Sequence, residues 1–216
     1  KDNAMSRKNY DLVDYDGSEA VKCYLASQLE LEKAMESLIR QLEEAGIAND
    51  TVIVISPDHY PYGLERSATW KNAKNYLKEL YGVTEMNRFS RDSNALIIWS
   101  GCLEDKNLKV ETPVYSLDIL PTLSNLFGLD YDSRLLVGRD VFSDTEPLVL
   151  WPEFSWKTDK GTYEAESRTF TPAEGADVDD GYVDRIKAIV SNKISYSREV
   201  QNMKYFQVLS DYLNGK

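Results

Sequence analysis

The chain has 216 residues, a net charge of −11 and a hydrophobic content of 42%. This length is enough for one domain with a buried core. The acidic balance argues against nucleic-acid binding, which normally needs a basic surface, so no nucleic-acid partner is expected. No apolar run approaches the roughly 20 residues of a membrane-spanning helix. The two cysteines, Cys23 and Cys102, are too few for a disulfide framework.

The opening stretch, residues 1–17, is polar and shows no clear periodicity, and the first residue is Lys1. We therefore expect an irregular lead-in at the start of a piece of a longer protein. From Ser18, a suitable N-cap, apolar residues recur at three- and four-residue steps as far as Gly46. This pattern predicts one long helix.

Two apolar runs follow, at residues 51–56 and 95–99, and neither shows polar alternation. Such runs are typical of strands that are covered on both faces, as in a parallel sheet. Between them, an amphipathic helix is predicted around residues 72–81, and Gly82 closes it. The first half of the chain therefore alternates between helix and strand.

The second half of the chain begins with a predicted helix at residues 115–128, with Gly128 as its stop. Residues 148–216 are expected to hold a strand pair, at 148–154 and 161–170, followed by C-terminal helices. Together these elements predict a layered α/β fold with a mainly parallel sheet flanked by helices.

Asp58 and His59 directly follow the predicted strand 51–56, and His59 is the only histidine in the chain. In open α/β sheets, functional groups gather at the carboxyl ends of strands. A carboxylate beside a neutral imidazole suits manganese or zinc better than calcium. The pair therefore predicts part of a divalent-metal site, since stable coordination usually takes at least three protein ligands. The alternative is a turn in which Asp58 caps the following loop.

Three motifs in this order carry a family resemblance: TVIVISPDHYPYGL at 51–64, ALIIWSG at 95–101 and SLDILPTLSNLFG at 116–128. The chain resembles the C-terminal half of the sulfatase-like branch of the alkaline phosphatase superfamily. It is most similar to the lipoteichoic acid synthase and phosphoglycerol transferase group of Gram-positive bacteria. The resemblance implies an alkaline-phosphatase-like fold in which residues 1–216 are the C-terminal portion of one catalytic domain.

The resemblance also implies a metal-dependent enzyme, displayed outside the cell on N-terminal membrane helices. In the transferase group, a threonine nucleophile takes glycerol phosphate from a phosphatidylglycerol-type lipid with the help of a divalent ion, typically manganese. The aspartate and histidine metal ligands of the family carry over onto Asp58 and His59. Mn²⁺ is thus the expected cofactor, with Zn²⁺, Mg²⁺ and Ca²⁺ as alternatives.

The other metal ligands of the family, a glutamate and the nucleophile, lie upstream in such proteins, in the missing N-terminal half of the domain. The substrate-binding histidine of the family has no counterpart here, because His59 is already assigned. The catalytic and substrate-binding residues therefore remain unknown. The chain alone is expected to be soluble and inactive.

Two other readings stay open. Sulfatases convert a cysteine in a C-x-P-S-R motif into their nucleophile, and neither Cys23 nor Cys102 lies in such a motif. A sulfatase that hydrolyses sulfate esters nevertheless remains an alternative to a transferase acting on phosphate esters, because no nucleophile lies in this chain. The other alternative is a non-catalytic α/β binding module.

Several further residues invite a functional reading. Tyr60, Tyr62 and Trp70 follow the metal pair and could line a headgroup pocket, although packing is the commoner role of aromatic residues near a strand end. Asp118 lies in the first turn of its helix, where a carboxylate favours capping over catalysis. The acidic run 177–180 lacks the EF-hand spacing and is expected to be a solvated loop.

Overall fold

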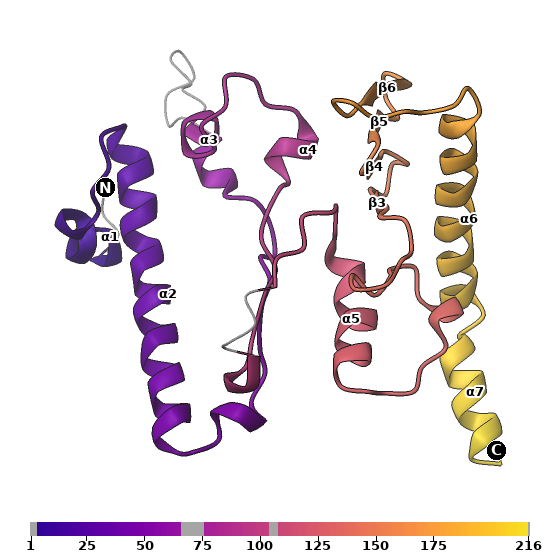
Figure 1. Ribbon diagram of the computed structural model, residues 1–216, viewed down its shortest axis with the longest axis horizontal. Helices are drawn as coiled ribbons and strands as arrows, with labels where there is room; N and C mark the ends of the chain where they lie inside the picture. Colours follow the sequence, from indigo (N-terminus) through magenta and orange to yellow (C-terminus); the bar gives the residue numbers. More distant parts are fainter. Residues whose placement is uncertain (1–3, 66–75, 104–107, 216) are drawn as a thin grey trace. The chain divides into compact units, whose positions relative to one another are not determined.

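The computed structural model describes residues 4–65, 76–103 and 108–215. The chain divides into two compact units, residues 1–108 and 109–216, and the described part of each contains its own sheet (Figure 1). The assignment of residues 1–216 to a single catalytic domain stays a prediction. The elements of the first unit are α1 (Ala4–Asn9), α2 (Glu19–Glu44), β1 (Ile53–Ile55), α3 (Tyr76–Leu80), α4 (Arg88–Arg91) and β2 (Ile97–Trp99). Those of the second unit are α5 (Ile119–Leu126), β3 (Val149–Leu150), β4 (Trp156–Thr158), β5 (Gly161–Glu164), β6 (Thr169–Pro172), α6 (Tyr182–Asn202) and α7 (Tyr205–Leu213).

The long helix predicted from Ser18 to Gly46 is confirmed as α2. The Ser18 hydroxyl accepts a hydrogen bond from the backbone N–H of Val21 at 3.3 Å, as an N-cap does. Gly46 adopts a φ of 70°, a left-handed conformation that ends helices and that glycine tolerates without strain. The local signals in the sequence thus set both ends of this helix.

The expectation of an irregular lead-in at residues 1–17 was wrong, because α1 lies there and packs along α2 (Figure 1). Asn9 at its end is fully buried. Its amide donates to the Ala26 carbonyl at 3.1 Å and to a Glu30 carboxylate oxygen at 2.7 Å. Both acceptors lie on α2. Contacts with residues distant in the sequence therefore stabilise α1, which local periodicity does not predict.

The strands predicted at 51–56 and 95–99 are present as β1 and β2, but they pair antiparallel, with Ile53 opposite Trp99. The sheet was predicted to be mainly parallel, and this is not confirmed: every strand pair in the described residues is antiparallel. The side chains of Val54 and Ile97 remain 37% and 52% exposed. An unbroken apolar run indicates a strand that can be buried on both faces, yet it does not specify the direction of its neighbour.

The helix predicted at 115–128 is confirmed as a 3₁₀ turn, Ser116–Asp118, that leads into α5. Gly128 follows with a φ of 62° and closes it. The predicted helix 72–81 begins within residues 66–75, which lie outside the described residues, and its described part is α3. In the parts of the chain that the structure describes, no helix is long and apolar enough to cross a membrane.

The strand pair predicted after residue 148 is instead a four-stranded antiparallel sheet in the order β3-β4-β5-β6. Each predicted strand is interrupted by a residue with positive φ, Phe154 at 71° and Arg168 at 55°. A left-handed residue reverses the chain direction. The predicted strand 148–154 thus contains only β3, and β4 lies in the segment between the two predicted strands. The turn at Arg168 divides the predicted strand 161–170 into β5 and the start of β6.

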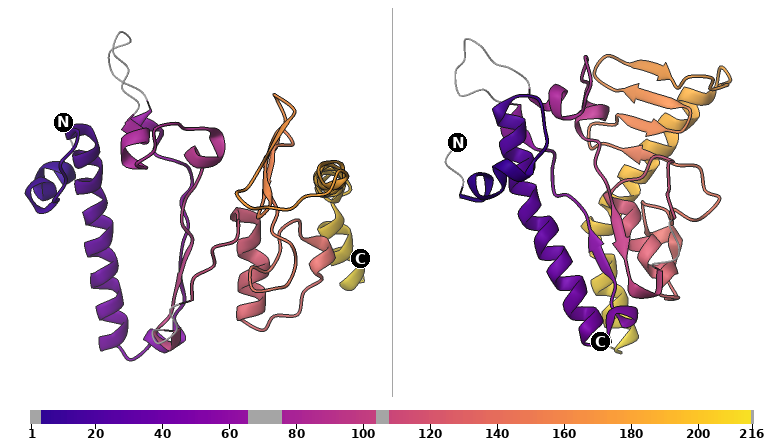
Figure 2. Two further views of the ribbon diagram at one scale, coloured as in Figure 1. Left: turned by 45° about the horizontal axis from the view of Figure 1, so that its top comes forward. Right: turned by 60° about the vertical axis from the view of Figure 1, so that its left-hand side comes forward.

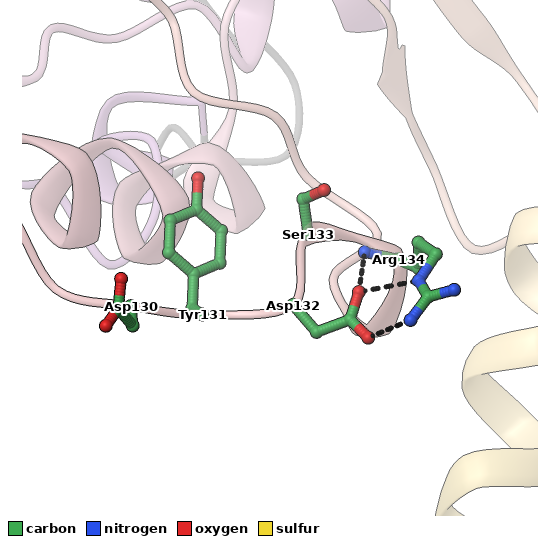
Figure 3. A pocket seen from close by; sticks show the side chains of 5 residues that line it. All are labelled: Asp130, Tyr131, Asp132, Ser133 and Arg134. Atoms are coloured by element: carbon green, nitrogen blue, oxygen red, sulfur yellow. Dashed lines mark hydrogen bonds and ion pairs between the residues drawn. The ribbon is translucent and has the colours of Figure 1, made fainter.

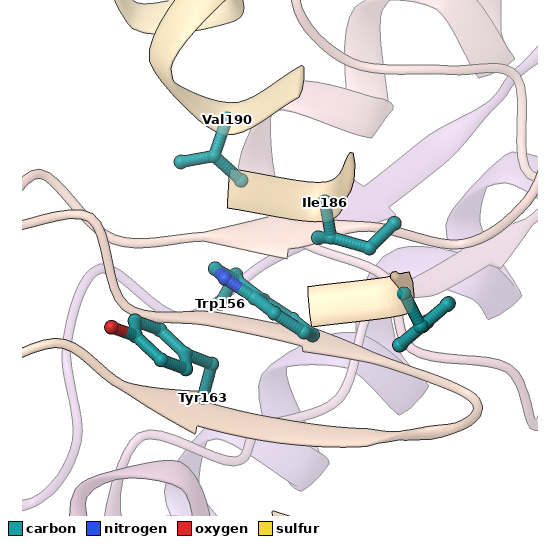
Figure 4. Close-up of a cluster of buried hydrophobic side chains, with 5 residues drawn as sticks. Trp156, Tyr163, Ile186 and Val190 are labelled. Carbon is teal, nitrogen blue, oxygen red and sulfur yellow. The ribbon is translucent and has the colours of Figure 1, made fainter. Parts of the chain in front are cut away.

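The core of the second unit lies between this sheet and α6 (Figure 2). Trp156 and Tyr163 occupy opposite positions on β4 and β5, and their rings stack with centroids 5.4 Å apart. Ile186 and Val190, one turn apart on α6, face this pair from above the sheet (Figure 4). Tyr182 completes the cluster, and its hydroxyl makes a 2.8 Å hydrogen bond with the Thr158 hydroxyl.

Candidate metal centre

Asp58 and His59 lie in the loop after β1, three and four residues beyond its last residue. Both side chains are accessible: the Asp58 carboxylate is 89% exposed and the His59 ring 49%. Asp58 Oδ1 and His59 Nε2 are 3.5 Å apart. Within the described ranges, Asp58 makes no hydrogen bond that caps the following loop. The Asp58 carboxylate therefore lies exposed in this loop, next to the His59 ring.

The protonation of the His59 ring follows from its other contact. His59 Nδ1 lies 2.7 Å from the backbone carbonyl oxygen of Tyr60. A carbonyl can only accept, so Nδ1 carries the proton and donates it. In a neutral ring, Nε2 then keeps its lone pair on the side facing Asp58. Metal-binding histidines commonly hold the non-ligating nitrogen in this way, which fixes both the tautomer and the ring orientation.

The spacing of the two donor atoms can be compared with that of metal ligands. Bonds of about 2.1 Å at about 90° put neighbouring ligands roughly 3 Å apart. The 3.5 Å separation of Asp58 Oδ1 and His59 Nε2 is slightly wider than this spacing. Among the residues that the structure describes, no group of three or more candidate ligands comes together. The assignment of Asp58 and His59 as metal ligands therefore stays a prediction.

The two tyrosines after the metal pair have separate roles. The Tyr62 ring lies 4.4 Å from the His59 ring, centroid to centroid, and helps to orient it. Tyr60 donates its hydroxyl proton to Glu65 at 2.7 Å, and this hydrogen bond raises the pKa of Tyr60. The guanidinium of Arg91, on α4, lies 4.6 Å from the centre of the Tyr60 ring. Tyr60 therefore acts as a packing residue, as aromatic residues near strand ends commonly do. The predicted pocket residue Trp70 lies outside the described residues.

Asp118 acts as a cap, as its place in the first turn predicts, and it also joins two segments. Its carboxylate accepts hydrogen bonds from the backbone N–H of Tyr115 at 3.1 Å and of Arg139 at 2.8 Å. Only 1% of the residue is exposed, and this burial raises the pKa of the Asp118 carboxyl. The contact with Arg139, 21 residues further along the chain, could not be found from local sequence.

The acidic run 177–180 is tied to α6 through Asp179. Its carboxylate forms two 2.7 Å hydrogen bonds with the Arg185 guanidinium and accepts a third from the backbone N–H of Gly181 at 2.9 Å. The Arg185 contact lowers the pKa of Asp179 to about 2. The run is therefore an exposed charged turn that Asp179 connects to α6.

A shallow hollow in the second unit is lined by the loop Asp130–Arg134 (Figure 3). Two of its charged groups, Asp132 and Arg134, are paired: Arg134 donates to Asp132 through Nε at 2.8 Å and through Nη2 at 2.6 Å, and Asp130 lies outside this pair. This pairing lowers the pKa of Asp132 to about 2. The hollow therefore presents a neutralised ion pair and no converging set of reactive groups.

Comparison with known proteins gives two findings. The model of the Sulfatase family matches residues 2–129, more than half of the chain. Lipoteichoic acid synthase of Staphylococcus saprophyticus is 26% identical over 136 residues, which are 61% of this chain and 20% of that protein. Lipoteichoic acid synthase 1 of Bacillus subtilis is 27% identical over 148 residues, 68% of this chain and 22% of that protein.

Lipoteichoic acid synthase of Staphylococcus aureus (strain USA300) is 27% identical over 156 residues, 69% of this chain and 21% of that protein. The chain thus spans about a fifth of the length of these curated relatives. No solved structure shows a significant match. The matched residues 2–129 include the metal pair, both strands of the first unit and α5.

Proposed function

The chain belongs to the sulfatase family, and from that premise we propose that it is part of a metal-dependent phosphoglycerol transferase of cell-envelope synthesis. The observation that carries the proposal is the geometry of Asp58 and His59. Their free donor atoms face each other after β1, and the Tyr60 carbonyl holds the proton on the opposite nitrogen of the ring. The similarity to lipoteichoic acid synthases supports the choice of transferase.

In this proposal the chain supplies two metal ligands. Asp58 contributes an anionic oxygen and neutral His59 a nitrogen, a mixture that suits Mn²⁺ or Zn²⁺ better than Ca²⁺. A bound ion lowers the pKa of the nucleophile and neutralises charge on the oxygens of the transferred phosphoryl group. The Tyr60 carbonyl accepts a hydrogen bond from Nδ1 of His59, which leaves Nε2 as the metal-binding nitrogen, and the Tyr62 ring packs against the imidazole.

The whole protein is then expected to contain a nucleophile and further ligands upstream. We propose a phosphatidylglycerol-type lipid as donor substrate, and a membrane-anchored protein with its catalytic domain outside the cell. A sulfuric ester hydrolase is the second candidate, because the matching family carries the name Sulfatase. A nucleophile of the threonine or the cysteine type in the upstream sequence distinguishes the two.

Replacing either ligand is expected to abolish the response to metal. The wild-type chain should gain thermal stability with increasing Mn²⁺, because an ion that binds only the folded state stabilises it. Asp58→Ala and His59→Ala should lose this gain, and in the full-length protein each should reduce transferase activity by about 100-fold or more, since even supporting residues of metal sites matter about 10- to 100-fold. Differential scanning fluorimetry and a lipid-transfer assay measure the two effects.

The control is Asp130→Ala, which removes an exposed carboxylate from the second unit and should leave the response to Mn²⁺ unchanged. The chain alone, with two ligands, is expected not to hydrolyse a chromogenic phosphodiester. If the purified chain hydrolyses this substrate and Asp58→Ala does not, the residues of this chain suffice for catalysis. That result would contradict the proposal that the nucleophile and further metal ligands lie upstream. If Mn²⁺ still raises the thermal stability of both Asp58→Ala and His59→Ala, the ion binds at another site.

A further inference from the structure

The metal pair, Asp58 and His59, lies in a loop, and residues outside the loop must hold its conformation. Asp58 and His59 are largely exposed, and a short loop with exposed side chains samples many conformations. A metal site binds well only when its ligands are held close to the productive geometry. The residues that anchor the loop therefore bear on the site although they touch no metal.

Arg91 contacts this loop through Tyr60, the residue next to His59. The guanidinium lies 4.6 Å from the centre of the Tyr60 ring, a cation–π distance. Asp92 fixes the guanidinium from the other side, accepting from Nε at 2.8 Å and from Nη2 at 3.5 Å. On the loop side, the hydrogen bond from Tyr60 to Glu65 holds the ring in place.

Arg91 itself belongs to a well-anchored element. α4 begins with a capping box, in which Asn87 and Ser90 each accept a hydrogen bond from the backbone N–H of the other. The Tyr81 hydroxyl donates to the Arg91 carbonyl at 3.2 Å. Tyr81 directly follows α3, which packs on α2 and contains the fully buried Leu77. A continuous series of contacts thus connects α2 with the loop that carries the metal pair.

We propose that Arg91 is a positioning residue that holds the Asp58–His59 loop through its contact with the Tyr60 ring. The backbone carbonyl of Tyr60 is the group that accepts the Nδ1 proton of His59. Fixing the Tyr60 ring therefore also fixes the acceptor that orients the imidazole. The effect on metal binding rests on the proposed function, whereas the effect on loop order does not.

The test uses the 216-residue chain and nuclear magnetic resonance. His59 is the only histidine, so its imidazole resonances report on this site alone. Without metal, Arg91→Ala and Tyr60→Leu should both lower the ¹⁵N heteronuclear NOE of residues 58–60. With Mn²⁺, paramagnetic broadening of the His59 ring signals should require about two- to fivefold more metal, the range of a partly exposed cation–π contact.

Three further variants sharpen the result. Arg91→Lys keeps the charge but loses the planar group that Asp92 holds, so its effect should be intermediate. The double variant Arg91→Ala/Tyr60→Leu should add little to Tyr60→Leu, because that variant already removes the Arg91 contact together with the hydrogen bond to Glu65. The matched control is Arg134→Ala, which removes an arginine paired within its own loop in the second unit and should behave as wild type.

Unchanged loop order in both Arg91→Ala and Tyr60→Leu would overturn the proposal, whether or not Mn²⁺ binds. If Arg91→Ala disturbs α4 itself, the comparison of Tyr60→Leu with Tyr60→Phe decides the matter. Both lose the hydrogen bond to Glu65 and leave those of α4 intact, but only Tyr60→Leu loses the ring that Arg91 contacts. Two results together would contradict the proposed function but support the positioning role of Arg91. The His59 signals of the wild-type chain would not broaden with Mn²⁺, and the loop would lose order in both variants.

Discussion

Replacing Trp156 with alanine is expected to lower the free energy of unfolding of the second unit by about 3–5 kcal/mol, the usual cost of truncating a large buried aromatic residue. The Trp156 side chain is fully buried. Its ring lies 5.4, 5.5 and 6.1 Å from those of Tyr163, Phe170 and Tyr182, centroid to centroid. Alanine leaves a cavity between β4, β5 and α6 that these rings cannot fill. Urea denaturation followed by circular dichroism measures the loss.

Two controls define the origin of this loss. The indole N–H of Trp156 has no hydrogen-bond partner among the described residues, so Trp156→Phe should cost clearly less than the alanine variant. Phe142→Ala removes an aromatic ring that is 46% exposed and should change stability by no more than about 0.5 kcal/mol. A Trp156→Ala variant as stable as Phe142→Ala would show that the cluster is not the core of this unit.

Replacing Asp118 with alanine is expected to destabilise the second unit by about 2–6 kcal/mol. The substitution leaves the backbone N–H groups of Tyr115 and Arg139 without their acceptor in a buried setting, at about 1–3 kcal/mol each. It therefore loosens both the start of α5 and the loop that holds Arg139. Chemical denaturation measures the change, and Asp130→Ala, which removes an exposed carboxylate, is the control. A loss no larger than that of the control would contradict the structural role of Asp118.

The pH dependence of stability provides a second test of Asp118. Burial raises its pKa above the ordinary value of 3.8, so the folded chain binds this proton more tightly than the unfolded chain does. The resulting stabilisation is fully present below pH 3.8 and is lost as the pH rises through the folded-state value. The stability of wild type relative to Asp118→Asn should therefore decline as the pH rises from below 3.8 through the raised pKa of the folded state. A difference that grows with pH would contradict this sign.

Local chemistry alone determined a large part of the first unit and of the site. Ser18 and Gly46 predict the ends of α2 because capping and left-handed termination act within a few residues. Asp58 and His59 follow an apolar strand, so the sequence identifies both as candidate ligands without any knowledge of the fold. The family resemblance agrees with the match of the Sulfatase model to residues 2–129.

Tertiary structure decided the features that depend on partners distant in the chain. The pairing of Ile53 with Trp99 makes the first sheet antiparallel, and an apolar run is equally compatible with either direction. The contact of Arg91 with Tyr60 spans 31 residues, too far for any helical or strand periodicity to encode. The facing donor atoms of the metal pair likewise depend on rotamers that the folded chain selects. Sequence patterns indicate which side chains are suited to burial or to capping a helix. Which strands and side chains contact one another depends on the packing of the whole fold.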